Sequence, residues 1–398
     1  VVTGIVQEFQ FGMNWSNYSR FVGDIFGAPL AMEGLLAFFL ESTFLGMWIF
    51  GWDRLPKKLH LASIWLAATG TVLSAYFILA ANSFMQHPIG YTMNGPRGRV
   101  ELTDIVAVLT QKTALSAFFH VVPSAFLASG ALFAGVGAWL MLKKKDVEVA
   151  QPAIKLGAVT IVISFLLVAA SGDFSARVMT QQQPMKMAAA EALFDSKPNA
   201  PFSLFTIGSL DGSHAVFQVG IPSLLSLMST GKTAGVVEGV NDLEKQYEQK
   251  YGAGSYTPVI WLAYWSFRLM IGFGALGLLL ALYMLWRMRK GGLPSSKWFN
   301  RAAIAMPFLP ILGTTFGWIF TESARQPWVV FGLLKTKDGV STAVSTGAVA
   351  FTMIAFTLLY GVLAVIEFGL MLKTIKQGPQ AAVEGSNAND GQQLTMAY

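Results

Sequence analysis

Residues 30–50 are apolar over enough length to cross a lipid bilayer, yet they contain two carboxylates, Glu33 and Glu41. An ionised acid at the centre of a bilayer costs roughly 2.5–3.5 kcal/mol, so an acid in such a segment is a candidate for function. In a regular α-helix these two side chains lie about 80° apart around the axis and roughly 12 Å apart along it, so they can line one polar seam. We predict proton transfer or metal-centre chemistry there; the alternative is that both acids only stabilise a helix bundle.

The composition is that of a membrane protein with several spans. Of the 398 residues, 54% are hydrophobic and 13% are charged, whereas about a quarter of the residues of a soluble domain are charged. The absence of Cys excludes disulfides, Cys-ligated zinc and Cys-ligated iron–sulfur clusters, and four His argue against an imidazole-rich metal site. The net charge of +6 arises at the ends of apolar runs. It therefore indicates membrane topology, and we predict no nucleic-acid partner.

Apolar runs predict an all-α fold, a polytopic transmembrane helix bundle with about seven complete spans. The runs lie near residues 29–52, 60–82, 113–142, 154–172, 258–287, 301–322 and 342–372. Lys and Arg residues gather in alternate connections, which by the positive-inside rule lie in the cytoplasm. The N-terminal residues, which are too few to cross a bilayer, are expected to be the end of a further span.

Four regions follow from this pattern. Residues 1–172 and 258–372 are expected to form two parts of the membrane bundle, residues 173–257 a long extracytoplasmic loop, and residues 373–398 a disordered cytoplasmic tail. Within the loop, Pro184 is placed to begin a helix, and residues 237–250, dense in Glu and Lys, predict a second one. A loop of this length with its own helices is usually functional.

His120 is the only His clearly inside a predicted span. A lone intramembrane His often only bonds to a neighbouring helix, and the alternative is an axial ligand of haem. Since the spans offer no second His, a low-spin haem would need another ligand such as Met.

Glu322 and Arg325 lie three residues apart at the end of another predicted span, so their side chains can be neighbours, with Trp318 one turn before them. An ordinary helix end with an interfacial Trp explains this pattern. Alternatively, Arg325 supplies a rigid donor fork to a haem propionate.

Several short motifs together resemble subunit I of the cytochrome bd-type quinol:oxygen oxidases. The motifs are EFQFGMNW at 8–15, GDIFGAPL at 23–30, FFLESTF at 38–44, GWD at 51–53, FRLM at 267–270 and RQPW at 325–328. The resemblance covers residue 1 to about residue 372, and the segment QQQPMKM at 181–187 resembles actinobacterial members with a short quinol loop. Family members begin with a further span and a half that carries a His ligand of an oxygen-site haem. We expect the present sequence to be truncated there.

The resemblance implies a low-spin haem b, a high-spin haem b and a haem d. His120 and Met270 match the axial ligands of the low-spin haem b, and Glu322 matches the carboxylate ligand of the high-spin haem b. The remaining residues expected to bind cofactor are Arg268 and Arg325, which match arginines near haem propionates, and Trp318.

The resemblance also implies roles for polar residues that would otherwise be unremarkable. Lys186 and Glu191 match quinol-loop residues implicated in quinol oxidation, and Glu33 and Glu41 match acids beside the oxygen-site haems, with Glu33 close to an iron. The residues that match a proton path from the cytoplasm are Glu41, Ser42, Asp53, Ser74 and Asn82.

The implied function is that of a terminal oxidase subunit in the bacterial cell membrane. It would oxidise menaquinol or ubiquinol, reduce O2 to water and generate a proton motive force without pumping. The implied partners are subunit II and small single-span subunits. Two other readings of the residues remain open: a proton-coupled secondary transporter that uses Glu33 and Glu41, and a haem-b electron carrier that does not react with O2.

Overall fold

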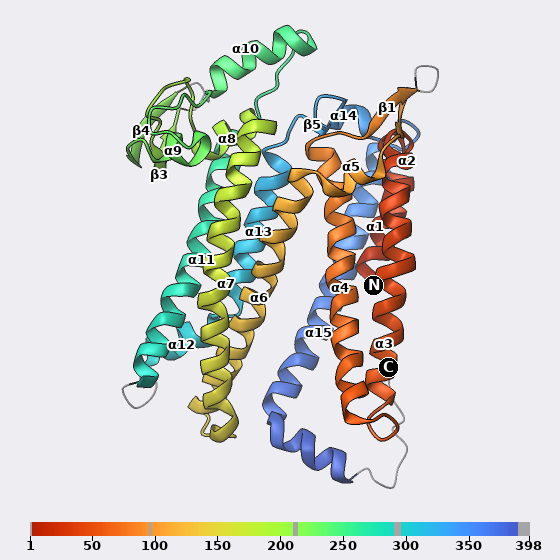
Figure 1. Cartoon of the computed structure of the whole chain (residues 1–398), viewed down its shortest axis with the longest axis vertical. Coiled ribbons are helices and arrows are strands. Elements are labelled where there is room, and N and C mark those ends of the chain that lie inside the picture. The colour runs from red at the N-terminus through yellow and green to blue at the C-terminus, as the bar shows by residue number, and fades with distance from the viewer. Residues whose placement is uncertain (1, 95–97, 210–213, 290–295, 389–398) are drawn as a thin grey trace.

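The computed structural model describes residues 2–94, 98–209, 214–289 and 296–388. Long helices run side by side through most of the molecule, and short helices and hairpins gather at one end of them (Figure 1). Six of the described helices are long and apolar enough to cross a membrane, and a bent helix pair adds a seventh if it counts as one span. The prediction of an all-α membrane bundle is therefore confirmed.

The long helices agree with the predicted spans but differ at their ends. A first continuous helical segment, Ser16–Phe50, comprises α2 (Ser16–Met32), the π-helix η1 (Glu33–Phe38) and α3 (Phe39–Phe50). The others are α4 (Lys57–Gln86), α6 (Lys112–Leu142), α7 (Val147–Gln182), α11 (Ile260–Arg289) and α15 (Thr346–Ala388), and α1 (Val2–Met13) precedes them all. Because α7 continues to Gln182, the first ten residues of the predicted loop are part of a membrane helix.

One predicted span is bent. Helices α12 (Lys297–Ala305) and α13 (Phe308–Ser323) meet at 48° across a short break. Pro307 stands in that break, directly before α13. A proline has no backbone N–H to continue the helical ladder and its ring clashes with the preceding turn, which accounts for the bend.

The π-helix η1 changes the relative direction of the Glu33 and Glu41 side chains. A π turn contains about one residue more than an α turn. Although Glu33 and Glu41 are eight residues apart in the sequence, their side chains therefore have the angular relation of residues seven apart in a regular α-helix. Their directions then differ by about 20°, rather than the 80° expected for an unbroken α-helix. The two acids therefore face nearly the same way.

Short elements cover one end of the bundle. The helices are α5 (Ile105–Thr110), α8 (Pro184–Glu191), α9 (Leu224–Thr230), α10 (Val240–Tyr251) and α14 (Thr336–Gly339). The antiparallel hairpins pair β1 (Tyr91–Asn94) with β2 (Arg99–Leu102), β3 (Phe202–Gly208) with β4 (Ala215–Ile221), and β5 (Trp328–Val330) with β6 (Leu334–Lys335). Helices α8 and α10 were predicted, and α8 begins at Pro184 as expected. The three hairpins were not predicted.

The first part of the predicted tail is helical. Helix α15 continues to Ala388, with a break at Gly378, where the backbone takes a positive φ of 80°. Residues 373–377 thus extend the apolar helix, and a separate helical stretch up to Ala388 follows the break. Residues 389–398 lie outside the described part of the chain.

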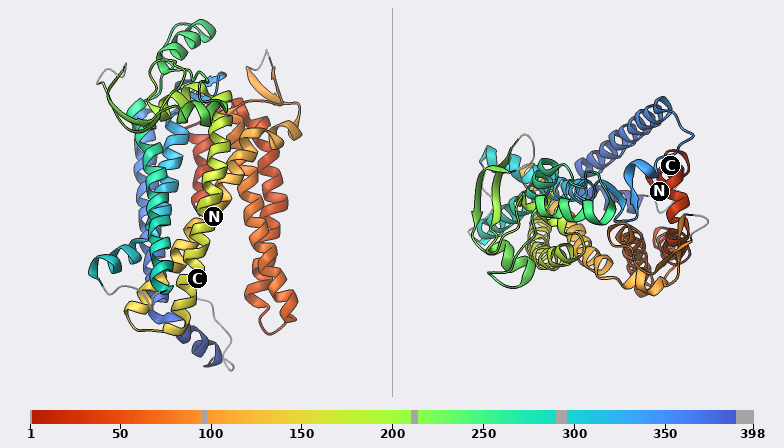
Figure 2. Two further views of the ribbon diagram at one scale, coloured as in Figure 1. Left: turned by 60° about the vertical axis from the view of Figure 1, so that its left-hand side comes forward. Right: turned by 90° about the horizontal axis from the view of Figure 1, so that it is seen from above.

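Two hydrophobic cores hold the bundle together. One joins α6, α7, α11 and α12 around Ile154, Ile161 and Met284. In it α6 and α7 approach so closely that a Cβ atom at Gly157 would lie 2.5 Å from the carbonyl oxygen of Gly130, as is common where small residues line helix contacts in membranes. The other core joins α2, α4, α5, β2 and β5. The short elements rest on the ends of both groups, as the two further views show (Figure 2).

Candidate functional site

Helix α8 is buried along almost its whole length, although it belongs to the loop rather than to the bundle. Every residue from Met185 to Glu191 is buried. The run Ala188–Ala189–Ala190 has side chains small enough to pack closely, and it contacts the cores formed with α10 and α11. The sequence thus places a lysine and a glutamate, Lys186 and Glu191, in an interior position where charged groups are rare.

Lys186 joins α8 to two membrane helices. Its Nζ donates hydrogen bonds to Oε1 of Gln86, the last residue of α4, and to the carbonyl oxygen of Thr321 in α13, both at 3.0 Å. Burial, and then the nearby Arg325 guanidinium, lower the pKa of Lys186 to about 7, while Glu322 acts in the opposite direction. Lys186 can therefore gain or lose a proton near neutral pH.

Glu191, at the other end of α8, has different partners. Its Oε2 accepts hydrogen bonds from Nη2 of Arg268 at 2.6 Å and from the backbone N–H of Ser203 at 3.0 Å. Burial raises the pKa of the Glu191 carboxyl, and the bonds to Arg268 and Ser203 offset part of this effect. Glu191 is thus a carboxyl group that takes up a proton more readily than an exposed glutamate.

Glu322 lies beside the lysine site. Its Oε1 accepts a hydrogen bond from Nδ2 of Asn82 at 3.2 Å, and its Oε2 pairs with the buried Arg325. The carbonyl that Lys186 binds belongs to the preceding residue, Thr321. The structure therefore brings together four residues that the sequence analysis had assigned to separate roles, since Asn82 was expected on a proton path.

Both arginines of the site have buried donors without partners among the described residues. Nε and Nη1 of Arg268 and of Arg325 are buried and make no hydrogen bond. A buried donor without a partner costs about 1–3 kcal/mol, so such atoms call for an explanation. Two guanidinium groups with free N–H groups fit an anionic ligand, and the carboxylates of a haem satisfy that requirement.

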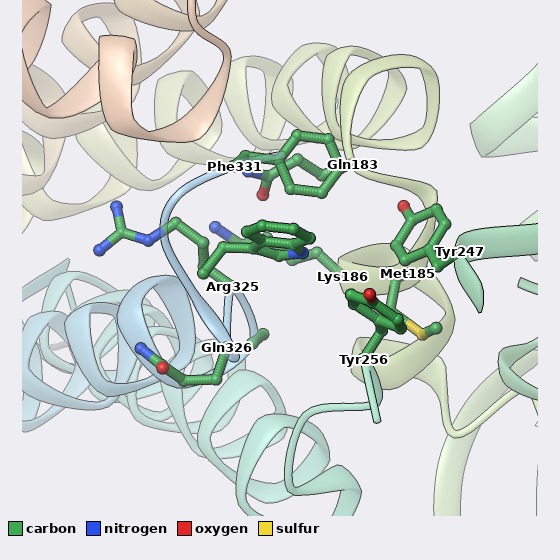
Figure 3. Close-up of a pocket in the computed structure, with 10 residues that line it drawn as sticks. Gln183, Met185, Lys186, Tyr247, Tyr256, Arg325, Gln326 and Phe331 are labelled. Atoms are coloured by element: carbon green, nitrogen blue, oxygen red, sulfur yellow. The ribbon is translucent and has the colours of Figure 1, made fainter. Parts of the chain in front are cut away.

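A small pocket lies between α8, α10 and the segment after α13. Figure 3 shows Lys186 and Arg325 on one side of it and Tyr247 and Tyr256 on another. Its lining also includes Trp328. Its volume is about 10 Å³, which holds about one water. A larger ligand would enter only if α8 or α10 moved.

His120 and Met270 lie within the bundle, each beside a glycine. His120 Nδ1 is 3.1 Å from Oγ of Ser171 in α7, and a Cβ atom at Gly172 would lie 3.5 Å from His120 Cε1. The sulfur of Met270 is so close to α13 that a Cβ atom at Gly317 would lie 2.9 Å from it. No group of three or more His, Cys, Asp or Glu among the described residues is arranged to hold a metal ion. Axial ligation by His120 and Met270 stays a prediction.

The predicted polar seam is partly assembled by α4. Ser74 Oγ donates a hydrogen bond to Glu33 Oε1 at 2.6 Å. One turn earlier, a Cβ atom at Gly70 would lie 2.8 Å from the backbone nitrogen of Glu41, so α4 lies directly against the π-helix region. Ser74 and Asn82 are separated by roughly 12 Å along α4. Helix α4 thus contacts Glu33 through Ser74 and Glu322 through Asn82, at two different depths of the bundle.

The remaining predicted residues are less enclosed. Asp53 is exposed in the turn after α3, and Ser42 is exposed with its Oγ 3.5 Å from the carbonyl oxygen of Phe39. Trp318 is exposed on α13. The structure does not bring these three residues to the buried sites.

Several polar residues of the loop site were not predicted from the sequence. They are Gln86, Gln183, Ser203 and Tyr264; Gln183 Nε2 donates to the carbonyl oxygen of Gln86 at 2.5 Å, and Ser203 Oγ lies 2.8 Å from Tyr264 Oη. Gln86 ends its helix and Gln183 directly precedes α8. Their partners are distant in the sequence, so no local pattern points to them.

Comparison with known proteins gives the family of the chain. The family model described as Cytochrome bd terminal oxidase subunit I matches residues 1–379. Cytochrome bd ubiquinol oxidase subunit 1 of Bacillus subtilis is 46% identical over 382 residues, which cover 96% of this chain and 81% of that protein. Cytochrome bd-II ubiquinol oxidase subunit 1 of Escherichia coli is 33% identical over 438 residues, which cover 96% of this chain and 85% of that protein.

A solved structure has the same fold. The bd oxidase from Geobacillus thermodenitrificans contains a chain that matches with a TM-score of 0.84 at 27% identity, covering 95% of this chain and 84% of that chain. The fold and the matches define a multi-pass membrane subunit of an oxidoreductase. The chain belongs to the cytochrome bd terminal oxidase subunit I family, as its motifs predicted. The alternative of a proton-coupled transporter is not supported.

Proposed function

We propose that this chain is the haem-bearing subunit of a quinol oxidase, with a low-spin haem b, a high-spin haem b and a haem d, and that quinol is oxidised at α8. The observation that carries the proposal is the buried contact of Lys186 with the carbonyl of Thr321, directly beside the Glu322–Arg325 pair. The proton-accepting amine of Lys186 thus contacts the residue next to Glu322, the candidate ligand of the electron-accepting haem.

Quinol oxidation releases two protons with its two electrons, so the site needs bases that are active near neutral pH. Lys186, with a pKa of about 7, supplies one. Glu191 is a second proton acceptor on the same helix, and burial raises its pKa. Efficient proton transfer requires a pKa near the working pH, which the environment of Lys186 favours. The helix around them is buried, so water competes little for these groups.

The haems would be held by residues of three membrane helices, α6, α11 and α13. His120 of α6 and Met270 of α11 are the proposed ligands of the low-spin haem b, and Glu322 of α13 that of the high-spin haem b. The unpartnered donors of Arg268 and Arg325 support this assignment, since they fit propionate carboxylates. Bound haem iron supplies one-electron transfer and, at the oxygen site, the reduction of O2 to water.

Protons for that reduction would enter from the cytoplasm through the seam between α3 and α4. The residues proposed for this path are Glu41, Ser42, Asp53, Ser74 and Asn82, and Glu33 would lie at its end, close to an oxygen-site iron. The hydrogen bond from Ser74 to Glu33 and the similar direction of the two acids support the inner part of this path. Uptake on one side and release from quinol on the other would generate a proton motive force without pumping.

We also propose an orientation in the membrane, partner subunits and a substrate. The α8 loop would lie outside the cell membrane and the C-terminal end of α15 in the cytoplasm, which the basic residues of alternate connections support. The exposed apolar length of α15 leaves room for subunit II, small single-span subunits or lipid. The quinol would be menaquinol or ubiquinol, and the relatives named above are ubiquinol oxidases.

A reduced-minus-oxidised optical spectrum of the purified protein with its partner subunit tests the proposal. We expect b-type bands together with a far-red chlorin band. Bands of haem b alone would favour a haem-b electron carrier, and a spectrum without haem bands would contradict the proposal.

A further inference from the structure

The hairpin formed by β3 and β4 has its polar and apolar faces reversed relative to a soluble protein. Phe205 pairs with Val219 and Ile207 pairs with Phe217, so these four side chains share one face. Thr206 lies between them in the sequence and points to the opposite face, because successive residues of a strand alternate. One face is therefore wholly aliphatic or aromatic, and the other carries hydroxyl groups.

The polar face is the one that packs against the protein. Ser203 and Thr206 are buried, with their hydroxyl oxygens 2.6 Å apart, and Ser203 Oγ is 2.8 Å from Tyr264 Oη of α11. The backbone N–H of Ser203 donates to Glu191. The hairpin is thus fixed to the loop site by hydrogen bonds, whereas a soluble hairpin is usually held by its apolar face.

The apolar face is open. Its five large side chains are each between 40% and 53% exposed: Phe205, Ile207, Phe217, Val219 and Ile221. Neither strand contains a charged residue. A two-stranded sheet is marginally stable alone, and exposed patches of this kind mark surfaces that meet a membrane or another protein.

The patch continues onto a membrane helix. Phe205 packs edge-on against Trp265 with ring centroids 5.3 Å apart, and Trp265 and the strongly exposed Trp261 lie in the first two turns of α11. Tryptophan is enriched at the boundary between lipid and water. Figures 1 and 2 both show the hairpin beside the end of α11. The face therefore lies at the level where that helix leaves the bilayer.

The other side of the loop has the opposite character. Helix α10 contains Asp242, Glu244, Lys245, Glu248 and Lys250. It packs on α8 above the end of the bundle, whereas the hairpin lies at the edge of the bundle (Figure 1). The loop therefore presents a charged helix away from the bundle and an apolar sheet at the bundle's edge, an arrangement suited to an interface between water and lipid.

We infer that the apolar face of the β3–β4 hairpin is inserted into the interfacial region of the bilayer leaflet on the loop side, next to α11. Lipid contact fixes β3 in place, and through Ser203 it fixes the carboxylate of Glu191. The inference concerns lipid binding and does not depend on the proposed quinol site.

Site-specific labelling tests this directly, because the chain contains no Cys. The variant Val219→Cys, in the purified complex reconstituted into phosphatidylcholine nanodiscs, is labelled with an environment-sensitive fluorophore. The wild-type complex is treated with the same fluorophore, and its signal corrects for labelling of thiols in other subunits. Gln249→Cys on the exposed side of α10 is the matched control. Ile207→Cys on the same face replaces Val219→Cys if that variant does not assemble.

We expect nitroxide groups near the lipid head groups to quench the Val219→Cys label several-fold more than the Gln249→Cys label, and aqueous iodide to do the reverse. Equal quenching of both labels by iodide would show that the face lies in water and would overturn the inference. Protection of the hairpin label from both quenchers would also overturn it, since a protein subunit would then cover the face.

Discussion

Glu191 Oε2 and Arg268 Nη2 lie 2.6 Å apart and form the most buried ion pair in the described part of the chain, with side chains only 2% and 9% exposed. The two residues are 77 positions apart in the sequence and join the loop helix α8 to the membrane helix α11. Removing one member of such a pair leaves an uncompensated buried charge and typically costs about 3–5 kcal/mol. The pair therefore couples the position of the loop to the bundle.

Replacing Glu191 by Gln tests its proton-accepting role. Gln keeps an acceptor for Arg268 and Ser203 but cannot take up a proton. We expect quinol-dependent turnover to fall by roughly tenfold or more. O2 reduction driven by an artificial donor to the haems should stay near wild type. Glu248→Gln on the exposed face of α10 is the control, and full quinol turnover in Glu191→Gln would return Glu191 to a structural role.

The pKa of Lys186 predicts a pH dependence. Because folding lowers this pKa from 10.5 to about 7, the unfolded chain binds more protons between these values. The contribution of Lys186 to stability therefore rises with pH across that window. The neutral amine is the proton acceptor, so quinol kcat/KM should rise as pH increases through about 7. Lys186→Met should abolish this inflection, whereas Lys245→Met, at an exposed position, should preserve it; a wild-type profile in Lys186→Met would refute the assignment.

The proposed low-spin haem ligands predict a spectroscopic loss. His120→Ala and Met270→Ala should each remove the low-spin haem b signal while leaving the other haems largely bound, because each variant deletes one axial ligand. Optical difference spectra of the purified variants measure this. Met353→Ala, an exposed Met on α15, serves as the control. Normal low-spin spectra in both ligand variants would show that other residues ligate the iron.

The acidic seam predicts loss of turnover without loss of fold. Glu33→Gln and Glu41→Gln keep the side-chain size but remove the titratable proton, so O2 consumption should fall by roughly tenfold or more. Glu33→Gln should also disturb an oxygen-site haem spectrum. Glu367→Gln on α15 is the control, since this acid lies in a membrane helix but is exposed. If the acids only stabilise the bundle, Gln will be tolerated or will increase stability, because burying a charge is costly.

A substitution at Gly70 tests whether α4 packs closely against the π-helix region. A Cβ atom there would lie 2.8 Å from the backbone nitrogen of Glu41 and 2.9 Å from the carbonyl oxygen of Ala37. Gly70→Ala should therefore force the helices apart and lower stability by about 1–3 kcal/mol, measured by thermal inactivation of the complex. Gly46→Ala on α3 should have little effect, because a Cβ atom there would have no atom within 4 Å other than those of its chain neighbours and its own helix backbone. Equal thermal stability of the two variants would contradict the packing.

The sequence by itself determined the bundle and the family. A membrane span needs a long apolar run with few charges, which is visible locally, so the spans were predicted with errors mainly at their ends. The start of α8 was also predicted, because a proline such as Pro184 fits the first turn of a helix but interrupts a helix that precedes it. The errors arose where helices continued beyond their apolar runs, as α7 and α15 do.

Only the tertiary structure decided which polar groups meet. Lys186 binds Gln86 and Thr321, 100 and 135 residues away, and the sequence spacing carries no information about such contacts. The π-helix that turns Glu33 and Glu41 to one side could not be predicted, since no residue of Glu33–Phe38 distinguishes a π-helix from an α-helix, and α4 packs directly against it at Gly70. The hairpin with an outward apolar face has the same origin: alternation along a strand fixes two faces, and the hydrogen bonds of Ser203 and Thr206 with the surrounding structure select which face turns inward.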